Sequence, residues 1–167
     1  MKLETGKTTS VAVTNEEQKG KITIRKKGEV LTGVTGEEGN LTFVYGNADF
    51  AGAEYNIYAA EDIYSQDKVT KVHKAGDLVE SLTTGEDGSA VSKELYLGKY
   101  EVQETKAPEG YLLNTQKYPV ELIYADQETE IVYGDVTVPD EIAKGKIRIT
   151  KTDKETNKPI PSGAEFT

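Results

Sequence analysis

Apolar and polar residues alternate along most of the chain. Apolar side chains occupy positions 53, 55, 57 and 59, and again positions 118, 120, 122 and 124. These segments are rich in Val, Ile, Tyr and Thr, which is typical of strands with one buried face. Glycine-containing turns separate the segments at 35–40, 74–77 and 84–88. No segment keeps an apolar stripe at helical spacing for three turns, so the pattern predicts an all-β fold, a two-sheet β-sandwich.

Part of the sequence occurs twice. Residues 11–16 and 19–26 reappear as residues 136–141 and 144–151 with one constant offset. Residues 51–55 resemble residues 162–166 at a shorter offset, which indicates an insertion after the first strand of the first copy.

We therefore expect a tandem array. Residues 1–18 would be the last strand of a preceding repeat. Residues 19–141 would be one complete domain, with a hairpin inserted at about residues 28–47 after its first strand. Residues 142–167 would be a linker and the first strands of the following repeat.

Charge and composition narrow the possible partners. The 167 residues include 20 basic and 29 acidic side chains, a formal net charge of -9, which disfavours nucleic acid and anionic membranes as partners. The sequence contains no run of roughly 20 apolar residues, so we expect no membrane insertion in this fragment. Cysteine is absent, so a protein of this sequence outside the cell would need a covalent staple other than a disulfide.

We expect no cofactor and no metal. The single histidine, His73, lies in a predicted hairpin and has no recognisable serine nucleophile to act on. The acidic turn at 85–88 does not have the alternating carboxylates of a calcium loop.

Three ionisable residues, Lys26, Glu104 and Asp140, each end a row of alternating apolar residues. The apolar rows occupy positions 22 and 24, 100 and 102, and 136 and 138. A single such residue usually lies where its strand leaves the core and is solvated. Three together indicate either a buried ion-pair cluster, which is costly in desolvation, or a reaction that removes the charges.

Four segments resemble the Cna B-type domain, the prealbumin-like module of Gram-positive pilins and cell-wall-anchored surface adhesins. They are Gly-Lys-Ile-Thr-Ile-Arg-Lys at 20–26, Gly-Ala-Glu-Tyr at 52–55, Leu-Gly-Lys-Tyr-Glu-Val-Gln-Glu-Thr-Lys-Ala-Pro-Glu-Gly-Tyr at 97–111, and Val-Pro-Asp-Glu at 138–141. The resemblance covers the whole predicted repeat, and its Glu-Thr-Lys-Ala-Pro-Glu-Gly-Tyr segment is specific.

The resemblance implies an isopeptide bond between Lys26 and Asp140, promoted by Glu104. The family's commoner acceptor is Asn, and Asp135 would be a competing acceptor here if the last strand were bulged. Such a bond requires the first and last strands to be adjacent. The only chemistry implied is one autocatalytic turnover, so we do not expect a turnover enzyme.

The function that the resemblance implies is a structural stalk or spacer repeat. It would be extracellular and anchored to the cell wall, with anchor and signal outside this fragment, and its partners would be neighbouring repeats. The alternative is an adhesin module that recognises a host protein or glycan through the inserted hairpin and the tyrosine-bearing segment 55–64. An exposed, contiguous aromatic patch would favour that alternative.

Overall fold

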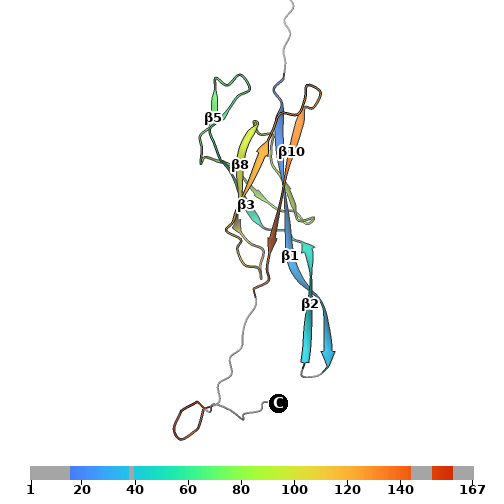
Figure 1. Ribbon diagram of the computed structural model, residues 1–167, viewed down its shortest axis with the longest axis vertical. Coiled ribbons are helices and arrows are strands. Elements are labelled where there is room, and N and C mark those ends of the chain that lie inside the picture. The colour runs from blue at the N-terminus through green and yellow to red at the C-terminus, as the bar shows by residue number, and fades with distance from the viewer. Residues whose placement is uncertain (1–15, 38–39, 144–151, 160–167) are drawn as a thin grey trace, which may run out of the picture.

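The computed structural model describes residues 16–37, 40–143 and 152–159. These residues form strands and no helix, hence no helix that could cross a membrane (Figure 1). The strands are β1 (Lys19–Glu37), β2 (Asn40–Asp49), β3 (Glu54–Ala59), β4 (Ile63–Tyr64), β5 (Lys71–His73), β6 (Leu78–Thr83), β7 (Ser89–Val91), β8 (Gly98–Lys106), β9 (Lys117–Leu122) and β10 (Ile131–Asp140). The all-β prediction is confirmed.

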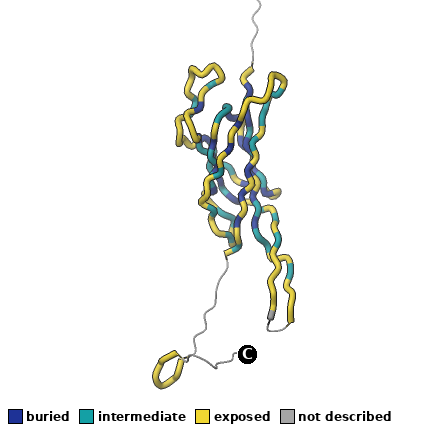
Figure 2. Tube along the Cα trace, in the orientation of Figure 1, coloured by how far each residue is buried: buried dark blue, intermediate teal, exposed yellow. Residues whose placement is uncertain are grey.

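Two four-stranded sheets face each other. The first has the order β10-β1-β2, with β7 also paired to β1, and the second has the order β6-β3-β8-β9. The alternating apolar residues of both sheets form one core between them, and Figure 2 shows the buried positions along the strands of the sandwich. Fully buried core residues include Ile22, Ile24, Tyr55, Ile57, Tyr100, Val102 and Val138. The predicted two-sheet sandwich is therefore confirmed.

The first and last strands of the sandwich are parallel neighbours. Their register runs without a shift from the pair Lys19 and Ile131 to the pair Gly28 and Asp140. The predicted adjacency of these strands is confirmed. Because the two strands are parallel, the chain enters the sandwich at one end and leaves it at the other (Figure 1).

The predicted hairpin after the first strand is a continuation of that strand. Beyond its pairing with β10, β1 runs on to Glu37 and pairs with antiparallel β2. We call residues 28–37 and 40–49 the ribbon. It projects past the end of β10, and most of its residues are exposed (Figures 1 and 2).

The predicted repeat boundaries are not tested by these strands. Residues 1–15, 144–151 and 160–167 lie outside the described residues. They include Asn15 and Lys151, the counterparts of Asp140 and Lys26 in the repeated segments. Residues 152–159 form a turn closed by a bridge between Thr152 and Pro159. The assignment of both tails to neighbouring repeats stays a prediction.

Candidate functional site

The three residues singled out by strand alternation meet inside the sandwich. Lys26 lies in register with Val138, and Asp140 lies in register with Gly28. Lys26 and Asp140 are therefore diagonal neighbours on the inner face of one sheet. Glu104 reaches them from β8 in the opposite sheet.

The amine of Lys26 touches both carboxylates. Its Nζ donates a 2.7 Å hydrogen bond to Glu104 Oε1 and also contacts Asp140 Oδ2. All three side chains are 0% exposed. An amine and two carboxyl groups are thus held in contact where water does not screen them, so their charges are costly and their positions fixed.

Asp140 is the least satisfied member of this group. Neither of its carboxylate oxygens has a hydrogen-bond partner among the described residues, so its contact with Lys26 is an ion pair without hydrogen-bond geometry. Burial raises the pKa of Asp140, the nearby charge of Glu104 adds to the increase, and Lys26 opposes it. The neutral acid, which an amine can attack, is therefore favoured relative to an exposed aspartate.

Both carboxylate oxygens of Glu104 accept hydrogen bonds. The Tyr55 hydroxyl donates a 3.1 Å hydrogen bond to Oε1, and the backbone N–H of Asn114 donates a 2.9 Å hydrogen bond to Oε2. Burial, with the charge of Glu104, raises the pKa of Tyr55, so its hydroxyl stays protonated and can donate. These two bonds fix the carboxylate toward Lys26.

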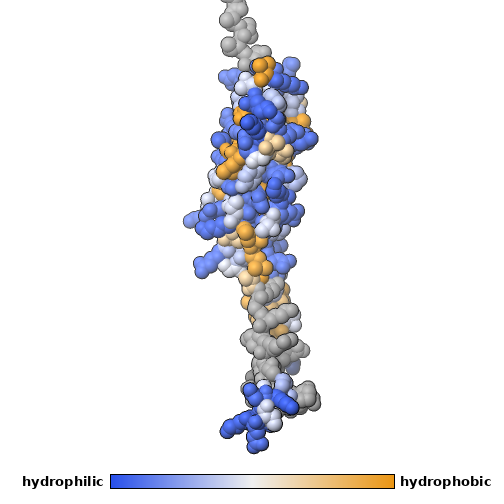
Figure 3. All heavy atoms as spheres, turned by 90° about the vertical axis from the view of Figure 1, so that its left-hand side faces the viewer, coloured by the Kyte–Doolittle hydropathy of each residue, from blue (hydrophilic) through white to orange (hydrophobic). Residues whose placement is uncertain are grey.

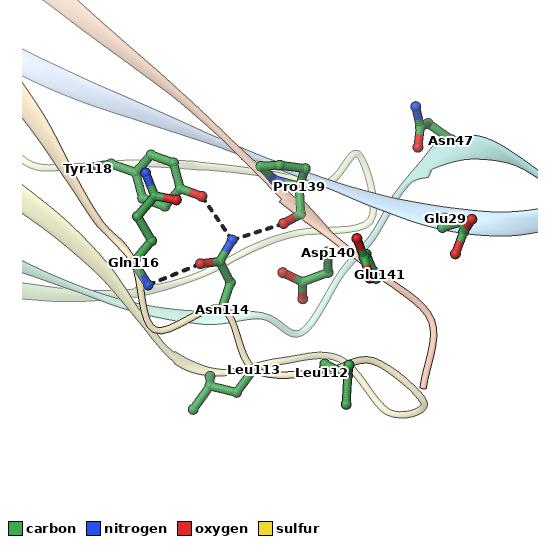
Figure 4. A pocket seen from close by; sticks show the side chains of 10 residues that line it. All are labelled: Glu29, Asn47, Leu112, Leu113, Asn114, Gln116, Tyr118, Pro139, Asp140 and Glu141. Carbon is green, nitrogen blue, oxygen red and sulfur yellow. Dashed lines mark hydrogen bonds between the residues drawn. The ribbon is translucent and has the colours of Figure 1, made fainter. Parts of the chain in front are cut away.

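Asn114 is a site residue that strand alternation did not find. Its Nδ2 donates to the carbonyl oxygen of Pro139 at 3.0 Å and to the Tyr118 hydroxyl at 2.8 Å (Figure 4). Asn114 therefore ties Glu104 to the strand residue that precedes Asp140. It lies between β8 and β9, outside any alternating segment, so the sequence pattern gave no signal for it.

The turn after β8 explains the end of the Glu-Thr-Lys-Ala-Pro-Glu-Gly-Tyr segment. The N–H of Tyr111 donates to the Pro108 carbonyl at 3.2 Å, and Gly110 has a φ of 88°. A positive φ at the third residue of such a turn favours glycine. The Tyr111 hydroxyl then donates to the Glu29 carbonyl at 2.8 Å, so the turn folds back onto β1.

An open cavity of about 500 Å³ adjoins the site. Asp140, Asn114, Tyr118, Leu112 and Leu113 are among its lining residues (Figure 4). The side chain of Asp140 is buried, but the cavity places space for small molecules such as water next to it.

The competing acceptor lies elsewhere. Asp135 is exposed and pairs with Thr23 on β1, on the outer side of the sheet. The bulge in β10 that would turn it inward is not present, because the β1–β10 register has no shift. The geometry therefore favours Asp140 over Asp135.

The tyrosine-bearing segment is not the aromatic surface that the adhesin alternative expected. Tyr55 is fully buried, whereas Tyr64 is 39% exposed. In β3 the side chains alternate between core and surface, so the tyrosines of this segment do not form one patch. Tyr55 therefore does not belong to a binding surface, and the adhesin alternative stays a prediction.

Comparison with known proteins gives a family. A family model described as SpaA, prealbumin-like fold domain, matches residues 44–137, which is more than half of the chain. The chain belongs to this family. The matched region of the SpaA prealbumin-like domain contains Glu104, whereas Asp140 lies just after it and Lys26 lies well before it.

One curated relative is the trypsin-resistant surface T6 protein of Streptococcus pyogenes serotype M6. It is 44% identical over 43 residues, which are 26% of this chain. The chain spans only 8% of that protein's length.

Solved structures that match the chain include a Bacillus protein and a pilin of Corynebacterium. The TIE protein of Bacillus anthracis has a TM-score of 0.49 and 28% identity, covering 84% of this chain and 20% of that one. The major pilin SpaD of Corynebacterium diphtheriae has a TM-score of 0.49 and 22% identity, covering 80% of this chain and 32% of that one.

Proposed function

We propose that this SpaA prealbumin-like domain is a structural spacer repeat of a Gram-positive surface protein or pilin, stapled by an isopeptide bond between Lys26 and Asp140. The observation that carries the proposal is the buried contact of the Lys26 amine with Asp140 and Glu104. Residues 19–141 are the complete repeat, and residues 1–18 and 142–167 belong to its neighbours. The protein is extracellular, with its cell-wall anchor outside this fragment.

The reaction is a condensation that needs no outside reagent. Proton transfer within the buried ion pair gives a neutral amine and a neutral carboxylic acid. Lys26 Nζ attacks the side-chain carbonyl carbon of Asp140 and a C–N bond forms. The C–O bond to the hydroxyl then breaks, and the hydroxyl leaves with a proton from nitrogen as one water. The net change is an ammonium and a carboxylate converted to an amide and water.

Glu104 acts as the promoter of this condensation. Its hydrogen bond to Nζ positions it to carry a proton from the attacking amine to the departing hydroxyl. Tyr55 and Asn114 keep its oxygens in place for that transfer. The fold holds the reactants in contact, which replaces a bimolecular encounter with a high effective concentration. The adjoining cavity offers the released water a way out.

An isopeptide bond at this position suits a domain that carries tension. The chain enters at the start of β1 and leaves at the end of β10, so pulling on its ends shears two parallel strands. A covalent bond between residues 26 and 140 would carry that force and shield the chain between them. By analogy with a disulfide that closes a loop of similar length, it would stabilise the fold by about 4–5 kcal/mol.

Intact-mass spectrometry of the purified chain tests the proposal. We expect the wild-type chain to be lighter than its sequence by one water. Lys26→Ala, Glu104→Ala and Asp140→Ala should each have the full sequence mass and a lower melting temperature.

Asp135→Ala is the matched control, because it removes a carboxylate from the same strand but from the outer face. It should still lose one water. A wild-type mass equal to the sequence mass would leave the three residues as a buried ion cluster. Loss of water that survives Asp140→Ala and disappears in Asp135→Ala would move the acceptor to Asp135.

A further inference from the structure

The ribbon has one apolar face. The cross-strand pairs are Leu31 with Tyr45, Val34 with Phe43, and Gly36 with Leu41. A bulge between Leu31 and Gly33 shifts the register by one residue. Leu31, before the bulge, and Val34, after it, therefore point to the same face of the ribbon. Five large side chains share this face and are between 39% and 54% exposed: Leu31, Val34, Leu41, Phe43 and Tyr45.

The opposite face of the ribbon is different. It carries the pairs Val30 with Gly46, Gly33 with Val44, and Thr35 with Thr42. Among the described residues of this face, Val44 is the one large apolar side chain that is well exposed, at 43%, against five on the other face. Figure 3 shows the side of the sandwich that faces away from the ribbon, which is mainly hydrophilic with small separate apolar groups. A continuous apolar row on an edge strand is a surface that proteins normally cover.

We infer that the apolar face of the ribbon docks on the following repeat of the same chain, the repeat that opens at residue 144. The inference rests on the tandem array of the proposed function. Register gives the first argument: Gly28 pairs with Asp140 on a parallel strand, so the ribbon continues in the direction in which the chain leaves the sandwich (Figure 1).

The length of the ribbon fits this partner. From Gly28 to Glu37, β1 advances about 30 Å at roughly 3.3 Å per residue. This is close to the length of the ten-residue strand β10 in the sandwich itself. The ribbon is therefore long enough to lie along a neighbouring sandwich of the same kind, instead of touching only its tip.

Charge favours the following repeat over a second copy of the ribbon as the partner of the apolar face. Residues 28–49 contain no basic side chains and four acidic ones, one of which, Asp49, pairs with Lys27. Residues 144–159 contain two acidic side chains and five basic ones besides Lys151, the counterpart of the buried Lys26. Two ribbons would repel each other, and the ribbon and the opening of the next repeat attract each other at the short distances where salt does not screen them. Docked there, the ribbon limits bending between consecutive repeats.

A defined two-repeat chain tests the inference. Residues 1–166 are joined to a second copy of residues 56–143. The second repeat then begins with its own native residues 144–166, and Phe166 stands where Tyr55 stands in the first repeat. We expect amides of residues 41–46 to exchange with solvent at least tenfold more slowly in this chain than in residues 1–167. Small-angle scattering should show a narrow range of inter-repeat distances.

Two variants locate the contact on one face. Phe43→Ser should abolish the added protection and widen the distance range, whereas Val44→Ser, on the opposite face, should leave both unchanged. Lys144→Glu with Lys146→Glu leaves the ribbon itself intact and should also abolish the protection.

Equal exchange in the one-repeat and two-repeat chains would overturn the inference. Protection that grows with protein concentration would assign the face to a second copy, and protection gained only with a host protein or glycan would assign it to an external ligand; either result also overturns it. Loss of water, measured on the same samples, reports the isopeptide bond separately, so failure of docking is distinguishable from failure of the proposed function.

Discussion

Tyr55 and Glu104 face each other across β3 and β8, and the Tyr55 hydroxyl donates a 3.1 Å hydrogen bond to the same oxygen that accepts from Lys26. The oxygen Oε1 is thus held between a tyrosine and the amine. This arrangement makes Tyr55 a positioning residue for the proposed promoter, in addition to a core residue.

Replacing the Tyr55 hydroxyl tests that role. Tyr55→Phe keeps the ring in the core and removes one hydrogen bond to Glu104, at a cost of about 1.4 kcal/mol. If the lost hydrogen bond raises the activation barrier of amide formation by that amount, loss of water during refolding should slow about tenfold. Timed samples analysed by intact mass measure the rate. A lower melting temperature with an unchanged rate of water loss would reduce Tyr55 to a purely structural residue.

Asn114 gives a second prediction, because it links Glu104 to Pro139 next to the acceptor. Asn114→Ala removes the Nδ2 bonds to Pro139 and Tyr118 and loosens both carboxyl groups. We expect water loss to lag behind folding, with folding followed by tyrosine fluorescence and water loss by mass. Gln103→Ala is the control: it removes a half-buried side chain whose Nε2 donates to the Thr115 carbonyl at 3.5 Å, and it should leave the lag unchanged.

Burial of the three central residues could be predicted from sequence because strands have a period of two. Lys26, Glu104 and Asp140 each continue the inward row of their strand, and only parity is needed to place them. The resemblance to Cna B-type domains added their proposed roles. Parity does not say which strands become neighbours; in this chain that came from the resemblance and from the requirement that Lys26 meet Asp140.

The parts that sequence could not give depend on irregular backbone. Asn114 and Tyr111 lie in the turn region after β8, where no periodicity applies. The apolar face of the ribbon was hidden because the bulge after Leu31 changes parity within one strand. A strict alternation would place Leu31 and Val34 on opposite faces, although their partners Tyr45 and Phe43 share one.

The raised pKa of Asp140 predicts the pH dependence of the unreacted protein. Lys26→Met removes the amine, so no amide forms and the pairing that opposes the increase is lost. Above its ordinary value of 3.8, folded Asp140 then holds a proton that the unfolded chain has released. Because the folded state binds more protons, the free energy of unfolding should fall as pH rises.

Urea unfolding of Lys26→Met at a series of pH values from about 4 to about 7 measures this effect. Adding Asp140→Asn should remove the contribution of Asp140 to the pH dependence of the free energy of unfolding. A free energy that rises over this range in Lys26→Met, and is unaffected by Asp140→Asn, would contradict a buried carboxyl that prefers its neutral form.

Gly28 provides the last prediction, at the position on β1 that pairs with Asp140. A Cβ on Gly28 would lie 2.8 Å from the Tyr111 ring and 2.9 Å from the Phe50 ring, and these rings pack on each other with centroids 4.7 Å apart. Gly28→Ala should therefore lower the free energy of unfolding by about 1–3 kcal/mol through overpacking, as measured by urea unfolding in the Lys26→Met background. Gly33→Ala is the matched control on the same strand, because its Cβ would have no atom within 4 Å, and it should change the stability little. Equal losses in the two variants would mean that β1 is sensitive to any side chain, and that the ring pair does not require a glycine beneath it.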